Sequence, residues 1–304
     1  MNVKPSRGSS TAERPGAASG KTSLPRVIGD GEALRQAVRA LQQQGRTVGL
    51  VPTMGALHEG HLSLVDAARA ECDVAVATVF VNPTQFAAGE DFDRYPRDLE
   101  ADLAMLRERG CELVFAPSVD SMYGAGHTTW VEVGPLVDAL EGEFRPGHFR
   151  GVATIVLKLF QLAPADRAYF GRKDYQQTLV VRKMVEDLNV PLDVRVCPIV
   201  REPDGLAMST RNAYLSAEER VRARALWQSL QLAERLTREG ERDVAVLRRR
   251  MEQQIALVGG VEVQYIAFVA DGTVTPVDRI SGPTVVALAA KVGRTRLIDN
   301  TLIV

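Results

Sequence analysis

The sequence has few cysteines, no long apolar run and no excess of charge of either sign, and each absence excludes a class of protein. Its 3 cysteines among 304 residues form no Cys-x-x-Cys pair, so neither a disulfide framework nor a zinc ribbon is indicated. Free thiols fit a reducing, cytoplasmic setting. No apolar stretch approaches the ~20 residues of a membrane helix, so we expect no membrane partner. The 37 basic residues balance 38 acidic ones, which disfavours nucleic acid as a partner.

The first 25 residues are rich in Ser, Gly, Ala, Pro and basic residues and lack the apolar core of a secretory signal. They predict a disordered tail over residues 1–25. Within it, Gly16–Thr22 resembles a phosphate-binding loop. Pro15 stands where the first glycine is required and no strand precedes it, so we do not expect this segment to bind phosphate.

Short apolar strands alternate with helices over the first two thirds of the chain. The valine-rich run at Val74–Val81 is typical of a strand covered on both faces. Strands are predicted at 47–51, 74–81, 112–115, 167–170 and 194–196. Helices are predicted from a cap at Asp30 to Gly45, after a loop at 52–58, and over 99–109, 152–162 and 179–188. This alternation predicts an α/β fold, with a Rossmann-like, doubly wound parallel sheet over residues 26–199.

The alternation of short strands and helices stops after Val200. Ser216 and Glu219 form the signature of a capping box at the start of a long charged helix, and a second helix is expected over 243–258. Strand-like segments follow at 261–269, 284–291 and 296–303. They predict a smaller α+β domain over residues 200–304, which would act as a lid.

Two of the chain's 4 histidines lie close together, His58 and His61, in the segment Met54–His61 that joins a predicted strand to a predicted helix. Ligands bind outside the carboxyl ends of strands in such sheets. A helix N-terminus supplies free N–H groups and partial positive charge, the imidazoles add donors, and Gly60 leaves room for a ligand. The segment predicts a site for ATP phosphates, where fixed donors stabilise charge during attack by a carboxylate.

These histidines have two other interpretations. A zinc protease motif requires His-Glu-x-x-His, with its histidines four positions apart, whereas His58 and His61 are three apart. We therefore expect no metal ion bound by the protein. A capping or packing role remains open for either histidine alone.

A second strand-to-helix junction occurs at Gly171–Gln177. Gly171 permits close approach of a ligand, Lys173 supplies a cation, and Asp174 can accept from a ribose hydroxyl or from magnesium-bound water. The alternative is an N-capping Asp174 beside a solvated Lys173.

Two further loops carry polar side chains suited to ligands. In Met208–Asn212, two hydroxyls stand next to Arg211, a pattern that suits phosphate oxygens. In Phe80–Phe86, Asn82 and Gln85 offer neutral donors and acceptors that fit a small hydroxy acid, although Asn-Pro also begins plain turns.

Taken together, these segments resemble the pantothenate synthetase (pantoate–β-alanine ligase) family. That family lies within the nucleotidyltransferase superfamily that includes class I aminoacyl-tRNA synthetases. The matching segments are 51–61, 80–86, 145–151 and 208–212, and the resemblance covers residues 27–304. It implies that ATP and pantoate, with Mg²⁺, give pantoyl-adenylate and pyrophosphate. β-Alanine then releases AMP and forms pantothenate. It also implies a homodimer.

The resemblance also implies the site residues. The catalytic set is His58, His61, Lys173 and Arg211. The ATP site comprises Met54, Gly55, Ala56, Leu57, His58, Glu59, Gly60, His61, Gly171, Arg172, Lys173, Asp174, Val200, Met208, Ser209, Thr210 and Arg211. The pantoate and β-alanine site comprises Gln85 and Gln177, to which the polar side chain of Asn82 in the 80–86 segment is added.

One departure from the wider superfamily concerns its Lys-Met-Ser-Lys-Ser loop. Here Ala207 replaces the first lysine, so Lys173 and Arg211 have to supply the cations. The family assigns His61 as a proton donor. Because carboxylate and leaving group are both anions, adenylation needs no proton transfer, and we interpret His61 as a hydrogen-bond donor.

A second enzyme class shares the first histidine motif, namely a transferase that moves AMP or CMP onto a phosphate-bearing substrate. It requires an extra basic residue for the substrate phosphate, where this chain offers Asn82 and Gln85. A nucleotide sensor without catalytic activity is a third class, and would release no pyrophosphate.

Overall fold

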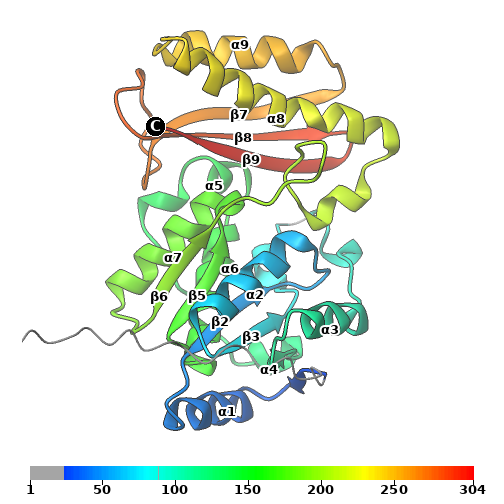
Figure 1. Ribbon diagram of the computed structural model, residues 1–304, viewed down its shortest axis with the longest axis vertical. Coiled ribbons are helices and arrows are strands. Elements are labelled where there is room, and N and C mark those ends of the chain that lie inside the picture. The colour runs from blue at the N-terminus through cyan, green and yellow to red at the C-terminus, as the bar shows by residue number, and fades with distance from the viewer. Residues whose placement is uncertain (1–23, 88) are drawn as a thin grey trace, which may run out of the picture.

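The computed structural model describes residues 24–87 and 89–304. Most of the predicted tail, with the loop-like segment Gly16–Thr22, lies outside these residues. The described chain forms two sheets stacked along the long axis of the molecule (Figure 1). The first is a six-stranded parallel sheet in the order β1-β4-β3-β2-β5-β6. The predicted α/β fold with a wound parallel sheet is therefore confirmed.

The parallel sheet and its helices account for the chain up to Cys197. Its strands are β1 (Arg26–Ile28), β2 (Val48–Thr53), β3 (Val74–Val79), β4 (Leu113–Phe115), β5 (Arg167–Gly171) and β6 (Asp193–Cys197). Its helices are α1 (Gly31–Gln43), α2 (Glu59–Glu71), α3 (Leu99–Glu108), α4 (Val119–Met122), α5 (Glu141–Phe144), α6 (His148–Leu162) and α7 (Tyr175–Asp187). Short 3-10 turns are η1 (Pro83–Gln85), η2 (Phe92–Arg94), η3 (Pro135–Val137) and η4 (Arg172–Asp174).

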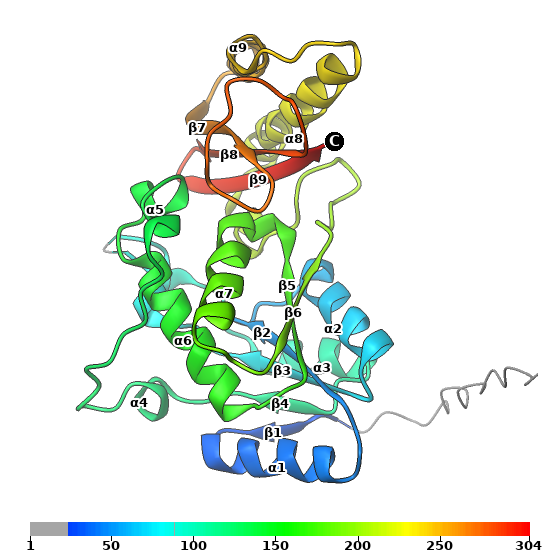
Figure 2. The same cartoon turned by 90° about the vertical axis from the view of Figure 1, so that its left-hand side faces the viewer.

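Both faces of the parallel sheet are buried. On β3, Val74 and Val76 pack with α1, α6 and α7 in one core, whereas Ala75 and Ala77 pack with α2 and α3 in another. Successive side chains of a strand point to opposite faces, so a strand between two helical layers has no polar face to show. This explains the continuous apolar runs of the sequence. Figure 2 shows the sheet with helices on either side.

Several predicted boundaries were wrong at the ends of elements. β2 continues to Thr53, β3 ends at Val79, α6 begins at His148 rather than 152, and α7 begins at Tyr175 rather than 179. The first turns of α6 and α7 carry polar residues, which hide the apolar period. The edge strand β1 was missed because it has only 3 residues.

The second sheet is antiparallel, in the order β7-β8-β9, with strands β7 (Val261–Ala270), β8 (Thr284–Val292) and β9 (Thr295–Ile303). Helices α8 (Ala217–Arg238) and α9 (Val244–Ala256) cover the face turned away from the parallel sheet (Figure 1). The predicted capping box is present, because Ser216 Oγ accepts from Glu219 N–H and the Glu219 carboxylate accepts from Ser216 N–H. The smaller α+β part is confirmed as a fold, while its lid role stays a prediction.

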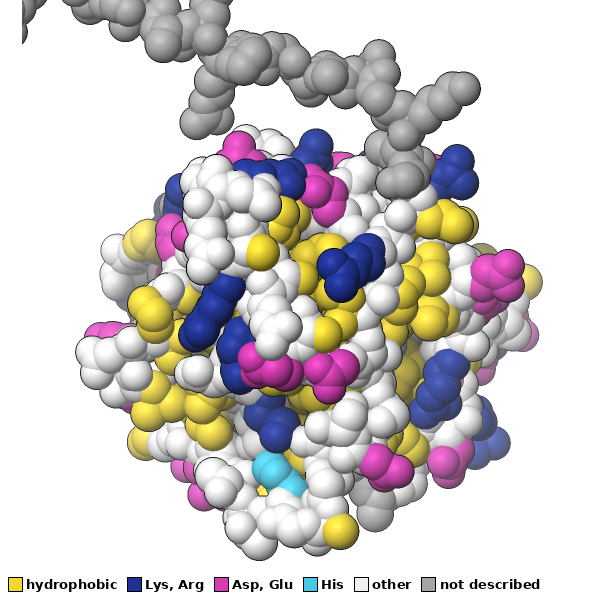
Figure 3. Space-filling model, turned by 90° about the horizontal axis from the view of Figure 1, so that it is seen from below, with side chains coloured by type: hydrophobic (Ala, Val, Ile, Leu, Met, Phe, Trp, Pro, Cys, Tyr) yellow, Lys and Arg dark blue, Asp and Glu magenta, His cyan; other side chains and the backbone are white. Residues whose placement is uncertain are grey.

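The surface, the cysteines and the helices show how the composition is distributed over the described residues. On the face at the α1 end, acidic and basic side chains are interspersed between apolar ones (Figure 3). All three cysteines are free, and Cys72 and Cys111 are buried. Within the described residues, no helix is both long and apolar enough to span a membrane.

Candidate active site

A cavity opens at the carboxyl ends of β2 and β5, where the winding of the sheet reverses. The chain leaves β2 through α2 toward β3 on one side and leaves β5 through α7 toward β6 on the other. Such a switch point is where open α/β sheets bind ligands. The loop after β6, which leads to the antiparallel sheet, closes the cavity with Pro198–Val200 and Met208–Arg211.

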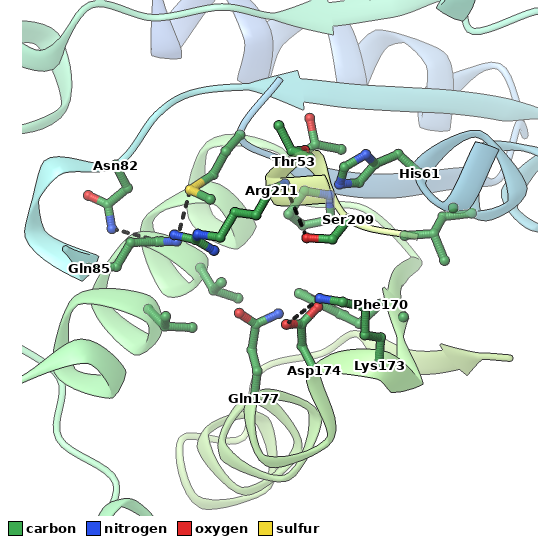
Figure 4. A pocket seen from close by; sticks show the side chains of 18 of the residues that line it. Thr53, His61, Asn82, Gln85, Phe170, Lys173, Asp174, Gln177, Ser209 and Arg211 are labelled. Atoms are coloured by element: carbon green, nitrogen blue, oxygen red, sulfur yellow. Dashed lines mark hydrogen bonds and ion pairs between the residues drawn. The ribbon is translucent and has the colours of Figure 1, made fainter. Parts of the chain in front are cut away.

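Most of the predicted site residues meet on this cavity. Those that line it are Met54, His58, Gly60, His61, Asn82, Gln85, Gly171, Lys173, Asp174, Gln177, Val200, Met208, Ser209, Thr210 and Arg211. In Figure 4 Gln85 and His61 lie on opposite sides of the cavity, Gln177 lies beside Asp174 and Lys173, and the Arg211 side chain extends toward Gln85.

Five predicted ATP-site residues do not line the cavity: Gly55, Ala56, Leu57, Glu59 and Arg172. Leu57 is buried in the core between α2 and the sheet. Glu59 faces outward and pairs with Arg109 at 2.7 Å, and Arg172 pairs with Asp271 at 3.1 Å. A run of consecutive residues at a turn cannot all face one way, so the sequence motif overstates the number of side chains on the cavity.

His58 is fixed by the first turn of α2. It is the N-cap residue, and its Nδ1 accepts from Gly60 N–H at 3.1 Å. The ring is therefore neutral with its proton on Nε2, which remains a donor. Burial, followed by the charge of Lys173, lowers the pKa of His58 to about 4. A Cβ on Gly60 would lie 2.8 Å from this ring, so glycine is needed here to make room for His58 itself.

His61 lies against His58, with 4.1 Å between ring centroids. Its Nδ1 is buried and has no hydrogen-bond partner within the described residues. Burial, followed by the electrostatic effect of the neighbouring His58 and Lys173, lowers the pKa of His61 well below its ordinary value. His61 is therefore neutral at physiological pH. The capping role that the sequence left open is real for His58, and it leaves the second nitrogen of that ring available.

The turn between β2 and α2 depends on a residue that sequence reasoning missed. Asp102 of α3 is buried and accepts from the N–H groups of Ala56 at 3.0 Å and Leu57 at 2.8 Å. Gly55 has φ +81°, and a Cβ there would lie 2.8 Å from Asp102 Oδ2. Glycine is thus required both by its backbone and by the approach of this carboxylate. No local pattern links positions 46 residues apart.

Lys173 and Asp174 do not follow the alternative of a cap beside a solvated lysine. Asp174 makes no capping hydrogen bond to α7, and the Lys173 side chain is only 20% exposed. Lys173 Nζ lies 3.6 Å from Asp174 Oδ1, a loose pair facing the cavity (Figure 4). The cation is therefore available to a ligand.

Asn82 lines the cavity, but its amide is already bonded within the protein. It is 1% exposed, and its Nδ2 donates to the Gly151 carbonyl and to Gln85 Oε1, both at 3.2 Å. Its Oδ1 accepts from Tyr123 Oη at 2.8 Å. With its amide satisfied by the protein, Asn82 is placed to orient Gln85. The Asn-Pro turn of the sequence is also present, because Asn82 caps η1.

Arg145 and His148 form a buried cluster with Gln85. The sequence analysis assigned them no role, and they entered it only as part of the matching segment 145–151. Arg145 pairs with Glu90 at 2.7 Å, and its Nη1 lies 3.0 Å from His148 Nε2. His148 Nδ1 lies 2.8 Å from the Gln85 carbonyl, which can only accept, so Nδ1 is the protonated nitrogen. Burial, followed by the charge of Arg145, lowers the pKa of His148 to about 4.

The loop at Ser209–Arg211 also binds within the protein. Thr210 Oγ1 donates to the Ala56 carbonyl at 3.1 Å, and Ser209 Oγ accepts from Arg211 N–H at 3.3 Å. The Arg211 guanidinium pairs with Asp91 through two hydrogen bonds. The loop thus bridges the turn before α2 and the segment after β3.

Comparison with known proteins identifies the family of this chain. Residues 26–302 match the sequence model of the pantoate-beta-alanine ligase family. The chain belongs to this family. The family resemblance and the enzyme class predicted from the sequence are thereby confirmed, and the ligase joins an acid to an amino acid through a C–N bond.

Individual relatives agree along nearly the whole chain. The pantothenate synthetase of Moorella thermoacetica is 51% identical over 271 residues, which cover 89% of this chain and 96% of that protein. That of Acidobacterium capsulatum is 55% identical over 258 residues, or 85% and 86% of the two chains.

Solved structures of the family share the fold. The pantothenate synthetase of Thermus thermophilus matches with a TM-score of 0.87 at 47% identity, covering 91% of this chain and 98% of that one. The pantoate-beta-alanine ligase of Francisella tularensis, complexed with beta-gamma ATP and beta-alanine, matches with a TM-score of 0.77 at 32% identity, covering 91% and 97%.

Proposed function

We propose that this ligase carries out both half-reactions in the cavity at the β2 and β5 ends. In the first, the carboxylate of pantoate attacks the α-phosphorus of ATP, forming pantoyl-adenylate as pyrophosphate leaves. In the second, the amine of β-alanine attacks the acyl carbon, forming pantothenate as AMP leaves. The observation that carries the proposal is the polarity of the cavity. Its wall combines donors and cations suited to phosphate groups, on His58, His61, Lys173 and Arg211, with the neutral amides of Gln85 and Gln177 (Figure 4).

The imidazole side chains suit the triphosphate. His58 keeps an Nε2–H donor beside the N-terminus of α2, and His61 adds a second neutral ring. Neutral donors are sufficient for adenylation because the nucleophile and the leaving group are both anions. Donors that are already fixed stabilise the charge that grows on the phosphoryl oxygens without reorganisation. Lys173 and Arg211 supply the positive charge.

The amide side chains suit pantoate, a branched hydroxy acid. Gln85 is held by Asn82 and donates to the Met54 sulfur, and Gln177 faces it across the cavity. Amides both donate and accept, as hydroxyl and carboxylate groups require. The nearby cation Arg145 is already paired with Glu90. The carboxylate of pantoate is thus left free to act as a nucleophile.

We propose that Mg²⁺ enters with ATP, bound chiefly by the phosphates. Within the described residues, no group of three or more His, Cys, Asp or Glu side chains could hold a metal ion. Mg²⁺ commonly keeps several waters and uses one or two carboxylates beside substrate phosphates. Asp174, on the cavity and 45% exposed, is a suitable acceptor for a metal-bound water or for a ribose hydroxyl.

The rest of the proposal concerns the whole molecule. The part from residue 200 onward would act as a lid, because its first loop contributes Met208–Arg211 to the cavity wall. Family membership supports a homodimer in the cytoplasm, with ATP, pantoate and β-alanine as its small-molecule partners.

The test is a product assay with purified protein, ATP, Mg²⁺, pantoate and β-alanine, each omitted in turn. Pantothenate and AMP should appear only when all are present. Exchange of labelled pyrophosphate into ATP should need pantoate but not β-alanine. Exchange that depends on phosphopantetheine instead of pantoate would indicate a transferase to a phosphate-bearing substrate. ATP binding without exchange with any acid would indicate a nucleotide sensor.

A further inference from the structure

Two neighbouring carboxylates after β3 each bind an arginine of the cavity wall. Glu90 holds Arg145, which belongs to the same part of the chain, whereas Asp91 holds Arg211, which arrives on the loop after β6. The Asp91–Arg211 contact joins residues 120 positions apart. Its side chains are well shielded, at 11% and 26% exposed. An ion pair this sheltered is screened by salt less than a surface pair.

The geometry of this pair leaves one edge of the guanidinium unused. Asp91 Oδ2 accepts from Arg211 Nε at 2.9 Å, and Asp91 Oδ1 accepts from Nη2 at 2.8 Å. Nη1 makes no hydrogen bond to the rest of the described chain. A bidentate carboxylate fixes the plane of the guanidinium. The Tyr95 ring lies beneath it, 6.0 Å from ring centroid to Cζ.

We propose that Asp91 is the positioning residue for Arg211, holding its Nε and Nη2 so that Nη1 serves the phosphates of the nucleotide. This rests on the proposed role of Arg211 as a phosphate ligand. Asp91 belongs to the parallel-sheet part and Arg211 to the following loop. The ion pair therefore makes the nucleotide site complete only when that loop lies against the first part of the molecule.

Neighbouring contacts favour positioning over a role in which Asp91 withholds Arg211 from the ligand. The loop is anchored on both sides of Arg211, by Thr210 to the Ala56 carbonyl and by Tyr214 Oη to the Arg94 carbonyl at 3.3 Å. Arg211 therefore lies on the cavity with its loop already in place. Burial alone would raise the pKa of Asp91, but the hydrogen bonds and charge of Arg211 outweigh it and lower that pKa. The carboxylate stays ionised at neutral pH.

The experiment is a double-mutant cycle read by pantoate-dependent exchange of pyrophosphate into ATP. Asp91→Ala and the near-isosteric Asp91→Asn should each lower kcat/KM for ATP about tenfold or more, with the KM for pantoate nearly unchanged. Asp91→Glu should recover part of the loss. In Arg211→Ala, adding Asp91→Ala should change the rate less than about twofold, because Asp91 acts only through Arg211.

Asp93→Asn is the matched control, because Asp93 is an exposed carboxylate two residues further along the same segment. It should leave exchange within about twofold of the starting protein. Thermal unfolding of each variant checks the fold, and Asp91→Asn serves if Asp91→Ala does not fold.

Three results would overturn the inference: unchanged exchange in Asp91→Asn, additive losses in the double variant, or faster exchange once Asp91 is removed. The last would mean that Asp91 restrains Arg211. The proposed function fails in a different way. If the unaltered protein shows no pantoate-dependent exchange, or if Arg211→Ala exchanges normally, the role assigned to Arg211 is wrong whatever Asp91 does.

Discussion

At the scale of single residues, protonation is decided by what each imidazole already binds. His58 Nδ1 is committed as the acceptor of its own helix cap, and His148 Nε2 faces a guanidinium. A proton on either nitrogen would break that contact in a buried place. Both rings are therefore neutral, and each has only one nitrogen that can donate.

This predicts different outcomes for two substitutions at position 58. Asn can keep the cap, because its Oδ1 accepts from Gly60 N–H, but it has no group where Nε2 stood. Gln can place an amide N–H there. His58→Asn should therefore fold normally and lose roughly 10²–10³ in adenylation rate, as for loss of one transition-state donor. His58→Gln should retain more activity. Near-normal pyrophosphate exchange in His58→Asn would contradict the assignment.

The pKa of His148 predicts how stability depends on pH. It is about 4 in the folded protein against 6.5 for a free side chain. Between these values the unfolded chain binds a proton that the folded protein does not, so the unfolding free energy falls as pH falls from about 6.5 to about 4. His148→Asn keeps a donor for the Gln85 carbonyl and removes this titration.

The measurement is the melting temperature of both proteins at about pH 7.5 and about pH 5. The difference between the two pH values should be smaller in His148→Asn. It should not vanish, because the pKa values of His58 and His61 are lowered as well. An equal or larger difference would show that His148 is not neutral in the folded protein.

At the scale of elements, a strand of the antiparallel sheet helps to position Lys173, which belongs to the parallel-sheet part of the molecule. Asn300 of β9 donates from Nδ2 to the carbonyl groups of Arg172, at 3.0 Å, and Lys173, at 2.9 Å. It is 2% exposed. These bonds fix the backbone of η4, from which Lys173 reaches the cavity. The cation thus depends on a strand more than 120 residues further along the chain.

Asn300→Ala is therefore expected to affect ATP more than pantoate. Two part-buried carbonyl groups lose their donor, which costs about 1–3 kcal/mol of stability, and the Lys173 backbone loosens. The KM for ATP should rise while the KM for pantoate stays near its starting value. Lys291→Ala, at an exposed position of β8, is the control and should change neither. A selective rise in the KM for pantoate would contradict this role of β9.

At the scale of the whole molecule, a sheltered ion pair ties the loop between the two parts to the antiparallel sheet. Arg201 pairs with Asp299 at 2.6 Å, and its guanidinium lies 3.7 Å from the centroid of Trp227. Asp299 is buried. Burial raises its pKa against the opposing effect of Arg201. Without Arg201 the carboxylate would be left in the interior without its ion-pair partner.

Arg201→Met should therefore lower the unfolding free energy by about 3–5 kcal/mol, the usual effect of removing one partner of a buried pair. Arg222→Met is the control. Arg222 pairs with Glu218 on the exposed side of α8, where such pairs contribute about 1 kcal/mol or less. Urea unfolding of both variants gives the comparison. Equal losses would show that the Arg201 pair is no stronger than a surface pair.

The sequence by itself determined the order of the longer helices and strands, several helix caps and the positions of the candidate ligand-binding motifs. Asp30 and Ser216 cap helices as predicted. These features depend on residues a few positions apart, so local periodicity and side-chain chemistry are enough to predict them. The motifs at 54–61 and 171–177 meet because parallel strands bring their carboxyl ends to one edge.

Only the tertiary structure decided which polar groups remain free for a ligand. From the sequence, Asn82, Glu59 and Arg172 look as suitable for a ligand as Gln85 and Lys173, yet each of the first three binds a distant partner within the protein. Asp102 and Asp91 likewise bind partners that are distant in the sequence, Ala56 and Arg211, which lie 46 and 120 positions away. The physical reason is that a buried polar group must find a partner. Which partner it finds depends on how the layers pack.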